Sequence, residues 1–136
     1  MQNDEYMTLV GHIQVLDVPL VSLYYDTASD RYFVAITLFG CDEMYAYLFV
    51  DITVETALKY MREEITMLTI LALSKNYYYY KNYGNKDLEL SDLRPISKIN
   101  AYRLFSKEAG VKPEYDRQLA YKSVGLKNFL ESKRNN

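Results

Sequence analysis

Nine residues, MYAYLFVDI at positions 44–52, limit the fold of this chain more than any other stretch. In a β-strand, successive side chains point to opposite faces of the sheet. The two alternating sets of this stretch are both apolar: one is Tyr45, Tyr47 and Phe49, and the other is Met44, Ala46, Leu48 and Val50. Such a strand needs cover on both faces. We therefore predict a central strand with side chains packed above and below it.

Three earlier stretches also have the composition of strands. Residues 8–16, 20–26 and 31–39 are rich in β-branched, aliphatic and aromatic side chains. The short sequences DVP, TASD and GCDE separate these stretches from one another and from 44–52, and each is typical of a turn. Strands joined by such short connections pair as hairpins. The first part of the chain therefore predicts an antiparallel sheet.

Helical spacing replaces this alternation after Asp51. Thr53 is placed to cap a helix over 54–64, and Thr66 is placed to cap a second one over 67–74. The second stretch is apolar on several sides, which predicts a buried helix. We predict an α+β domain in which a mainly antiparallel sheet packs against these two short helices. The expected core residues are Leu48, Val50, Leu58, Met61, Leu68 and Leu71.

Residues 75–85, KNYYYYKNYGN, contain an unbroken run of four tyrosines. A strand here turns Tyr77 and Tyr79 to one face and Tyr78 and Tyr80 to the other. We predict that one pair packs on the helices and that the other covers an open sheet face or an interface, because tyrosine has an apolar body and a polar tip. Base stacking is the alternative, although the surrounding residues are acidic. The candidate binding surface consists of Tyr77, Tyr78, Tyr79, Tyr80, Tyr83, Arg94 and Arg103.

Charge is divided along the chain. Residues 1–93 hold 6 Lys and Arg against 14 Asp and Glu, a formal charge of −8, whereas residues 94–136 hold 10 against 4, a formal charge of +6. We predict an acidic α+β domain over 1–95 and a basic, partly helical C-terminal extension over 96–136. We expect the extension to dock on the acidic domain or on a second subunit. Contact with nucleic acid is disfavoured, because the acidic domain would repel phosphates.

The sequence offers little material for a catalytic or metal site. His12 and Cys41 are the only histidine and cysteine, and we expect both to be structural. Common phosphate-binding and metalloprotease motifs are absent. Five carboxylates fall at expected strand ends, namely Asp26, Asp30, Asp42, Glu43 and Asp51. We interpret these as solvated turn residues rather than as a cation site or an acid–base pair. The prediction is a protein that is not an enzyme and holds no cofactor or metal.

The N-terminal sequence MQNDEYMTLV lacks the basic start and the apolar run of a signal peptide. The longest apolar stretch, at 67–74, is far shorter than a membrane span. We therefore expect a cytoplasmic protein without membrane contacts.

Three segments in this order resemble a family of uncharacterised small bacterial and phage proteins. In that family a YYDGP-like strand, a VPIS-like helix cap and a GKISLREAL-like helix follow one another, and YYDTAS, VDIT and EEITMLTIL stand in these places here. The resemblance covers about residues 16–96 and lacks the Gly-Pro and the Gly of the family pattern. It implies the same order of strands and helices, and it assigns no catalytic residue.

Several functions agree with these observations. The first is a non-catalytic protein-binding module of bacterial or phage origin, which binds a protein partner or forms a homodimer through its tyrosine-rich face. The second is a binder of a small molecule or nucleotide, such as an inhibitor of a host defence system. An enzyme built on the turn carboxylates and contact of nucleic acid with the basic extension are further alternatives.

Within the extension, Pro113 predicts the start of one short helix, and Gly125 is expected to separate that helix from 126–133.

Deleting residues 97–136 tests whether the extension is docked. The truncated chain should aggregate or change its oligomeric state, because tyrosine-rich sheet surface that the extension covers becomes exposed. Light scattering of both chains measures this. A soluble truncated chain with unchanged stability and mass would instead identify the extension as a free arm.

Overall fold

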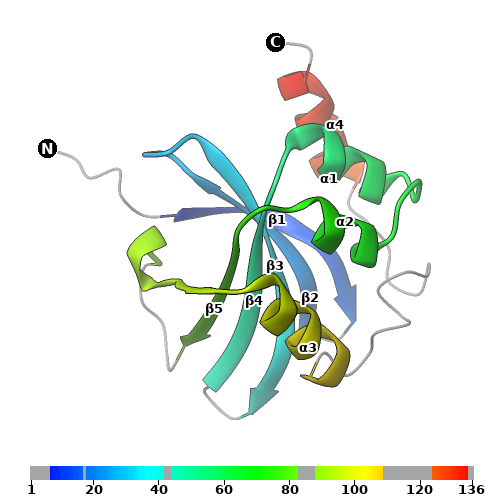
Figure 1. Cartoon of the computed structure of the whole chain (residues 1–136). Helices are drawn as coiled ribbons and strands as arrows, with labels where there is room; N and C mark the ends of the chain where they lie inside the picture. The colour runs from blue at the N-terminus through cyan, green and yellow to red at the C-terminus, as the bar shows by residue number, and fades with distance from the viewer. Residues whose placement is uncertain (1–6, 17, 42–43, 83–87, 109–123, 135–136) are drawn as a thin grey trace, which may run out of the picture.

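A computed structural model describes residues 7–16, 18–41, 44–82, 88–108 and 124–134 (Figure 1). In this part of the chain, six strands form one antiparallel sheet in sequence order. The strands are β1 (Met7–Leu16), β2 (Val18–Asp26), β3 (Arg31–Cys41), β4 (Met44–Ile52), β5 (Tyr77–Asn82) and β6 (Arg94–Ile96). The helices are α1 (Val54–Met61), α2 (Met67–Leu73), α3 (Lys98–Glu108) and α4 (Val124–Arg134), with a 3-10 turn η1 (Leu90–Asp92). The predicted α+β class is confirmed.

Strand β4 is central, as predicted, because it pairs with β3 on one side and with β5 on the other. Leu48 and Val50 are fully buried in a cluster that includes residues of all four helices, and we call this side of the sheet the helix face. Phe49 is equally buried in a second cluster on the opposite side, which we call the aromatic face. In the sheet register, Phe49 lies between Ala35 of β3 and Tyr78 of β5.

The two predicted helices follow β4 and lie on the helix face (Figure 1). Each begins at a threonine cap. The Thr53 hydroxyl accepts a hydrogen bond from the backbone N–H of Thr56 at 3.1 Å, and the Thr66 hydroxyl accepts one from that of Thr69 at 3.3 Å. Each bond satisfies one of the N–H groups that a helix start leaves without a partner. Both predicted caps are confirmed.

The expectation of a fully buried second helix is wrong. Leu68, a predicted core residue, is 48% exposed, and Leu73 is 59% exposed. Helix α2 has only seven residues, and its buried side consists of Met67, Ile70 and Leu71. Successive residues of a helix are about 100° apart around its axis. Leu68 and Leu73 therefore each lie roughly 110° from the middle of the buried side, in opposite directions around the helix.

Two further helices from the last part of the chain pack on the helix face. Ala101 and Phe105 of α3 and Leu126 and Leu130 of α4 belong to the same buried cluster as the cores of α1 and α2. Each pair is four residues apart, so each helix contributes one narrow apolar side. The helix face is thus covered from both the middle and the end of the sequence.

The sequence did not predict α3, and Gly125 lies inside α4 rather than before it. The helix expected from Pro113 lies outside the described residues.

The Arg62 guanidinium of α1 donates a hydrogen bond to the Glu131 carboxylate of α4 at 2.8 Å, which joins the two helices. The division at residues 95 and 96 stays a prediction. None of the described helices is long and apolar enough to cross a membrane.

Replacing Leu58 by Ala tests the packing of the helix face. Leu58 is fully buried on α1, so the substitution should lower the free energy of unfolding by about 2–5 kcal/mol. The matched variant Leu68→Ala removes the same atoms from an exposed site on α2 and should cost about 0.5 kcal/mol or less. Urea unfolding followed by circular dichroism measures both. Equal losses would contradict the assignment of the buried sides.

Candidate functional site

The four consecutive tyrosines of β5 are divided between the two faces of the sheet, as predicted. Tyr77 and Tyr79 pack on the helix face, and Tyr78 and Tyr80 pack on the aromatic face. Tyr77 and Tyr80 are only 5% and 8% exposed, so they offer little surface to a partner. Tyr83 lies outside the described residues. The alternation is confirmed, and two of the rings in the predicted binding surface are packing residues.

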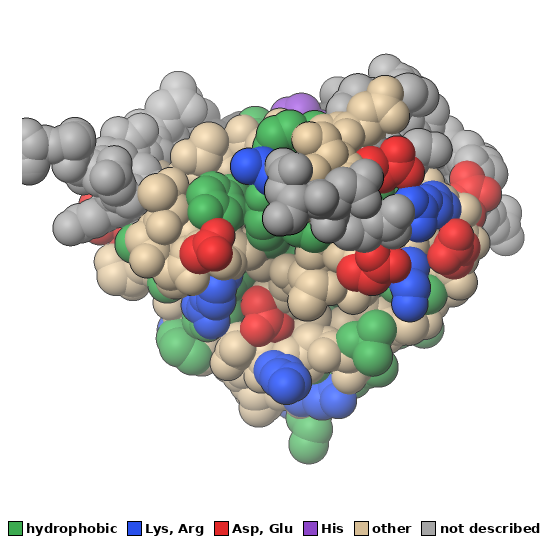
Figure 2. Space-filling view, turned by 90° about the horizontal axis from the view of Figure 1, so that it is seen from above, with side chains coloured by type: hydrophobic (Ala, Val, Ile, Leu, Met, Phe, Trp, Pro, Cys, Tyr) green, Lys and Arg blue, Asp and Glu red, His purple; other side chains and the backbone are tan. Residues whose placement is uncertain are grey.

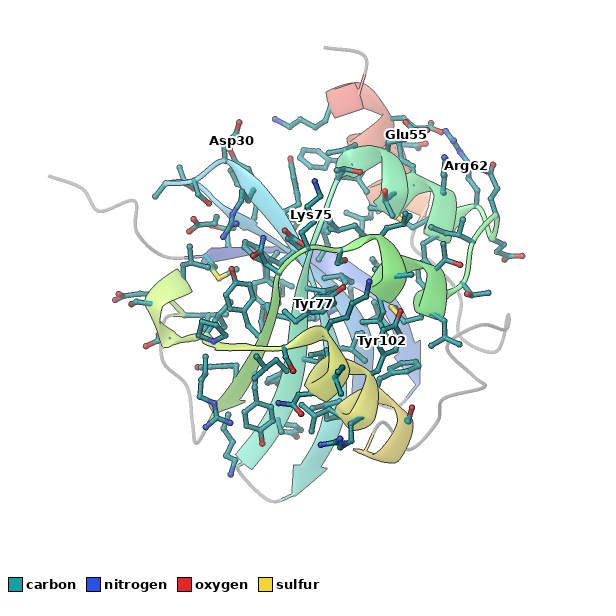
Figure 3. All side chains as sticks on the ribbon, viewed as in Figure 1. Asp30, Glu55, Arg62, Lys75, Tyr77 and Tyr102 are labelled. Carbon is teal, nitrogen blue, oxygen red and sulfur yellow. The ribbon has the colours of Figure 1, made fainter. Side chains whose placement is uncertain are left out.

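Tyr77 has a specific structural role. Its hydroxyl lies 2.5 Å from the carbonyl oxygen of Leu71 and 2.7 Å from that of Ser74, at the end of α2 (Figure 3). The last carbonyl groups of a helix lack partners within the helix. The Tyr77 hydroxyl can donate its hydrogen to either of these carbonyls and so connects the end of α2 to β5.

The aromatic face carries a network of rings. The centroid distances are 5.3 Å for Tyr24–Phe49, 6.2 Å for Tyr47–Tyr80, 6.1 Å for Phe49–Tyr80 and 5.9 Å for Phe33–Tyr78. These tilted, edge-to-face and offset contacts are the arrangements that aromatic rings prefer. Four aliphatic side chains from the sheet edge and the segment before β6 pack against the rings, namely Met7, Leu88, Leu90 and Leu93.

Burial on this face changes the titration of its tyrosines. It raises the pKa of Tyr47 to about 12, and it also raises the pKa values of Tyr24 and Tyr80 above the ordinary value. The reason is that an apolar environment disfavours the charged phenolate. These three hydroxyls carry no charge at physiological pH.

The remaining predicted binding residues lie on the helix side of the sheet and at its edge. The Arg94 guanidinium of β6 lies 5.1 Å from the centroid of the Tyr79 ring, a cation–π contact. Arg103 of α3 is exposed, and it donates a hydrogen bond to the Asn100 side chain at 3.3 Å. Among the residues of the predicted binding surface, Arg94 and Arg103 are exposed cations, and Tyr79 is half-buried.

Sequence reasoning missed a surface formed by α2 and α3. The Lys98 ammonium group donates a hydrogen bond to the carbonyl oxygen of Ala72 at 3.3 Å, which places the start of α3 beside the last turn of α2. Leu73 directly follows Ala72 and is 59% exposed, and Ile99 directly follows Lys98 and is 69% exposed. Leu68 lies one turn before Ala72 on α2. We call the surface formed by Leu68, Ala72, Leu73, Lys98 and Ile99 the α2–α3 surface.

Of the predicted turn carboxylates, Asp26 and Asp30 bind groups of their own turn and of the strand before it. The Asp26 carboxylate accepts hydrogen bonds from the backbone N–H and the hydroxyl of Ser29, at 3.1 and 2.5 Å. Asp26 is only 1% exposed, so its assignment as solvated is wrong. Asp30 accepts a hydrogen bond from the Tyr25 hydroxyl at 2.7 Å. Asp42 and Glu43 lie outside the described residues.

Asp51, near the end of β4, is hydrogen-bonded to the two residues just before β5. Its carboxylate accepts hydrogen bonds from the backbone N–H groups of Lys75 and Asn76, at 3.0 and 3.2 Å, and from the Asn76 side chain at 2.8 Å. In the described part of the chain, no three His, Cys, Asp or Glu side chains come together as metal ligands.

His12 and Ser22 form the one pair in which a histidine could act on a hydroxyl. The His12 Nδ1 lies 2.8 Å from the Ser22 hydroxyl oxygen, between β1 and β2. Among the hydrogen bonds of the described residues, none joins a carboxylate to the His12 ring, so the third group of a catalytic triad is missing there. The bond satisfies a nearly buried hydroxyl, which fits the structural role predicted for His12.

No family model matches this chain, and neither a curated protein nor a solved structure matches it. The resemblance to the bacterial and phage family therefore stays a prediction, and the function has to be inferred from the surfaces described above.

Tyr47 gives the fold a dependence on high pH. Its pKa of about 12 in the folded chain exceeds the ordinary value of 10.0. Above about pH 10, the unfolded chain loses a proton that the folded chain keeps. The stabilisation is thus fully present below about pH 10, and the free energy of unfolding should fall as pH rises toward 12. Tyr47→Phe should lose less stability than the unaltered protein between about pH 10 and 12 in urea unfolding. Equal losses would contradict the burial of the phenol.

Proposed function

We propose that this protein is a non-catalytic protein-binding module and that it binds its partner through the α2–α3 surface. The observation that carries the proposal is the exposure of Ile99, 69%, and of Leu73, 59%, which directly follow Lys98 and Ala72, the two residues of a contact between α3 and α2. Scattered single apolar residues are common on protein surfaces, but neighbouring large ones mark interaction sites.

The exposed aliphatic side chains of the α2–α3 surface are suited to the core of an interface. Full burial of an aliphatic side chain the size of isoleucine contributes about 1.5–3 kcal/mol. Ile99 stands at the start of an 11-residue helix whose other side holds Ala101 and Phe105 in the core. Because the helix is fixed by this packing, little conformational freedom is lost when a partner covers Ile99.

Charge around this surface favours an acidic partner. Lys98, Arg103 and Arg94 are exposed, and the ion pair recorded among the described residues joins Arg62 to Glu131 instead. Exposed cations around an apolar centre steer and orient an acidic partner, while the apolar contacts supply most of the affinity. A second copy of this chain has the required acidity, since residues 1–93 carry a formal charge of −8.

A photo-reactive benzoylphenylalanine at position 99 tests the proposal directly. After irradiation in cells, this position should capture one protein in stoichiometric amount, and light scattering shows whether that protein is a second copy. The matched control is the same residue at position 9, because Leu9 is 43% exposed on β1 and pairs with Tyr24 of the aromatic face. Position 9 should not capture the same protein.

The captured protein is then expressed and its affinity measured by calorimetry. Ile99→Asp should weaken binding by about tenfold or more, as for a central anchor, whereas Leu9→Asp should leave it unchanged. Rising salt concentration should slow association. The proposal is wrong if positions 99 and 9 capture the same proteins, or if Ile99→Asp binds the captured protein as tightly as the unaltered chain.

A further inference from the structure

A separate groove lies between the first three strands and α4. It has a volume of about 630 Å³ and is lined by residues of β1, by Tyr25 of β2, by Tyr32 of β3, and by Leu126, Phe129 and Lys133 of α4. Figure 2 views this end of the molecule from above, where hydrophobic side chains reach the surface among charged ones. Volumes of roughly 300–1,000 Å³ with mostly apolar walls are typical of small-molecule sites.

The walls of the groove are held in place by the fold. Helix α4 lies directly over Gly11 of β1, where a Cβ atom would be in ordinary van der Waals contact with the Leu126 side chain, at 3.4 Å. The rings of Tyr25 and Tyr32 pack against each other with centroids 4.8 Å apart. The Tyr25 hydroxyl donates its hydrogen to Asp30 at 2.7 Å, which fixes the ring at one end of the groove.

The opposite wall combines an exposed ring with a cation. Phe129 is 42% exposed, although large aromatic residues are usually covered, and the Lys133 ammonium group lies 5.5 Å from the centroid of its ring. Lys133 is the only charged side chain among the described residues that line the groove. A lysine also suits the last turn of a helix because of the helix dipole, so its contribution to binding has to be separated from this effect.

The tyrosines add hydroxyl groups without charge. The hydrogen bond to Asp30 raises the pKa of Tyr25, and burial raises that of Tyr32, so both stay protonated at physiological pH. The negative charge of Asp30 lies beside the tyrosine wall, and the positive charge of Lys133 lies on the helix wall. A bound anion is thus attracted to the helix wall and repelled from the Asp30 side.

We propose that this groove binds a small organic anion with an apolar body, such as a medium-chain carboxylate. The apolar body lies between Phe129 and the rings of Tyr25 and Tyr32, and the carboxylate lies at the Lys133 ammonium group. Apolar burial supplies the affinity, and the single cation selects an anionic headgroup over a neutral one. This site is independent of the α2–α3 surface, because the two share no residue.

The test uses octanoate and 1-octanol, which differ in the charge of the headgroup. In a titration of the ¹⁵N-labelled full chain followed by NMR, octanoate at about millimolar concentration should shift the amide signals of Val10, Gly11 and Phe129. Phe129→Asp should abolish binding of both probes. Lys133→Gln should weaken octanoate binding by about threefold to tenfold and leave octanol binding unchanged.

Two control variants separate binding from general effects on the fold. Lys59→Gln removes an exposed cation from the last turn of α1, the position in its helix that Lys133 has in α4. Leu9→Asp places a charge at a β1 residue as exposed as Phe129 but on the other face of the sheet. Both controls should bind octanoate like the unaltered protein. The proposal is overturned if octanoate shifts none of the groove signals, if Phe129→Asp still binds it, or if Lys133→Gln weakens both probes equally.

Discussion

Burial of both faces of β4 is the constraint on which the rest of this structure depends. Leu48 and Val50 on one side and Phe49 on the other are all removed from water. An antiparallel sheet with one solvated face would have left one of these sets exposed. A chain of 136 residues must therefore cover the sheet twice. It does so with four helices on one face and with tyrosine rings and a few aliphatic side chains on the other.

The aromatic face explains the tyrosine-rich composition. Among the described residues no α-helix packs on this face, which still needs apolar cover. A ring that ends in a hydroxyl can bury its body while its tip stays near water. Tyr47 and Tyr24 do this around the buried Phe49. At high pH this arrangement lowers the free energy of unfolding, because the half-buried Tyr47 resists ionisation. The run of four tyrosines is thus divided between the two faces of the sheet, and Tyr77 and Tyr80 are packing residues.

The sequence predicted what depends on local periodicity, and it failed where distant segments meet. The alternation in β4 and the threonines before α1 and α2 are local signals, and they located these elements correctly. The orientation of Leu68 depends on how α2 sits against the sheet, which no local pattern states. The groove between Tyr25 and Phe129 joins residues about a hundred positions apart in the sequence. Contacts of this kind follow from the tertiary fold and leave no periodic signal.

Helices α3 and α4 of the C-terminal part pack on the helix face of the sheet. Each buries two apolar residues four positions apart, Ala101 with Phe105 and Leu126 with Leu130. Each also exposes one large apolar side chain beside a lysine, Ile99 next to Lys98 and Phe129 under Lys133. The buried pairs fix the helices, so the exposed pairs are presented in one orientation and lose little entropy on binding. An apolar contact beside a single cation favours anionic ligands without demanding a fully buried ion pair, which would be costly to desolvate. The two proposals, an acidic partner at the α2–α3 surface and a small organic anion in the groove, both rest on this combination.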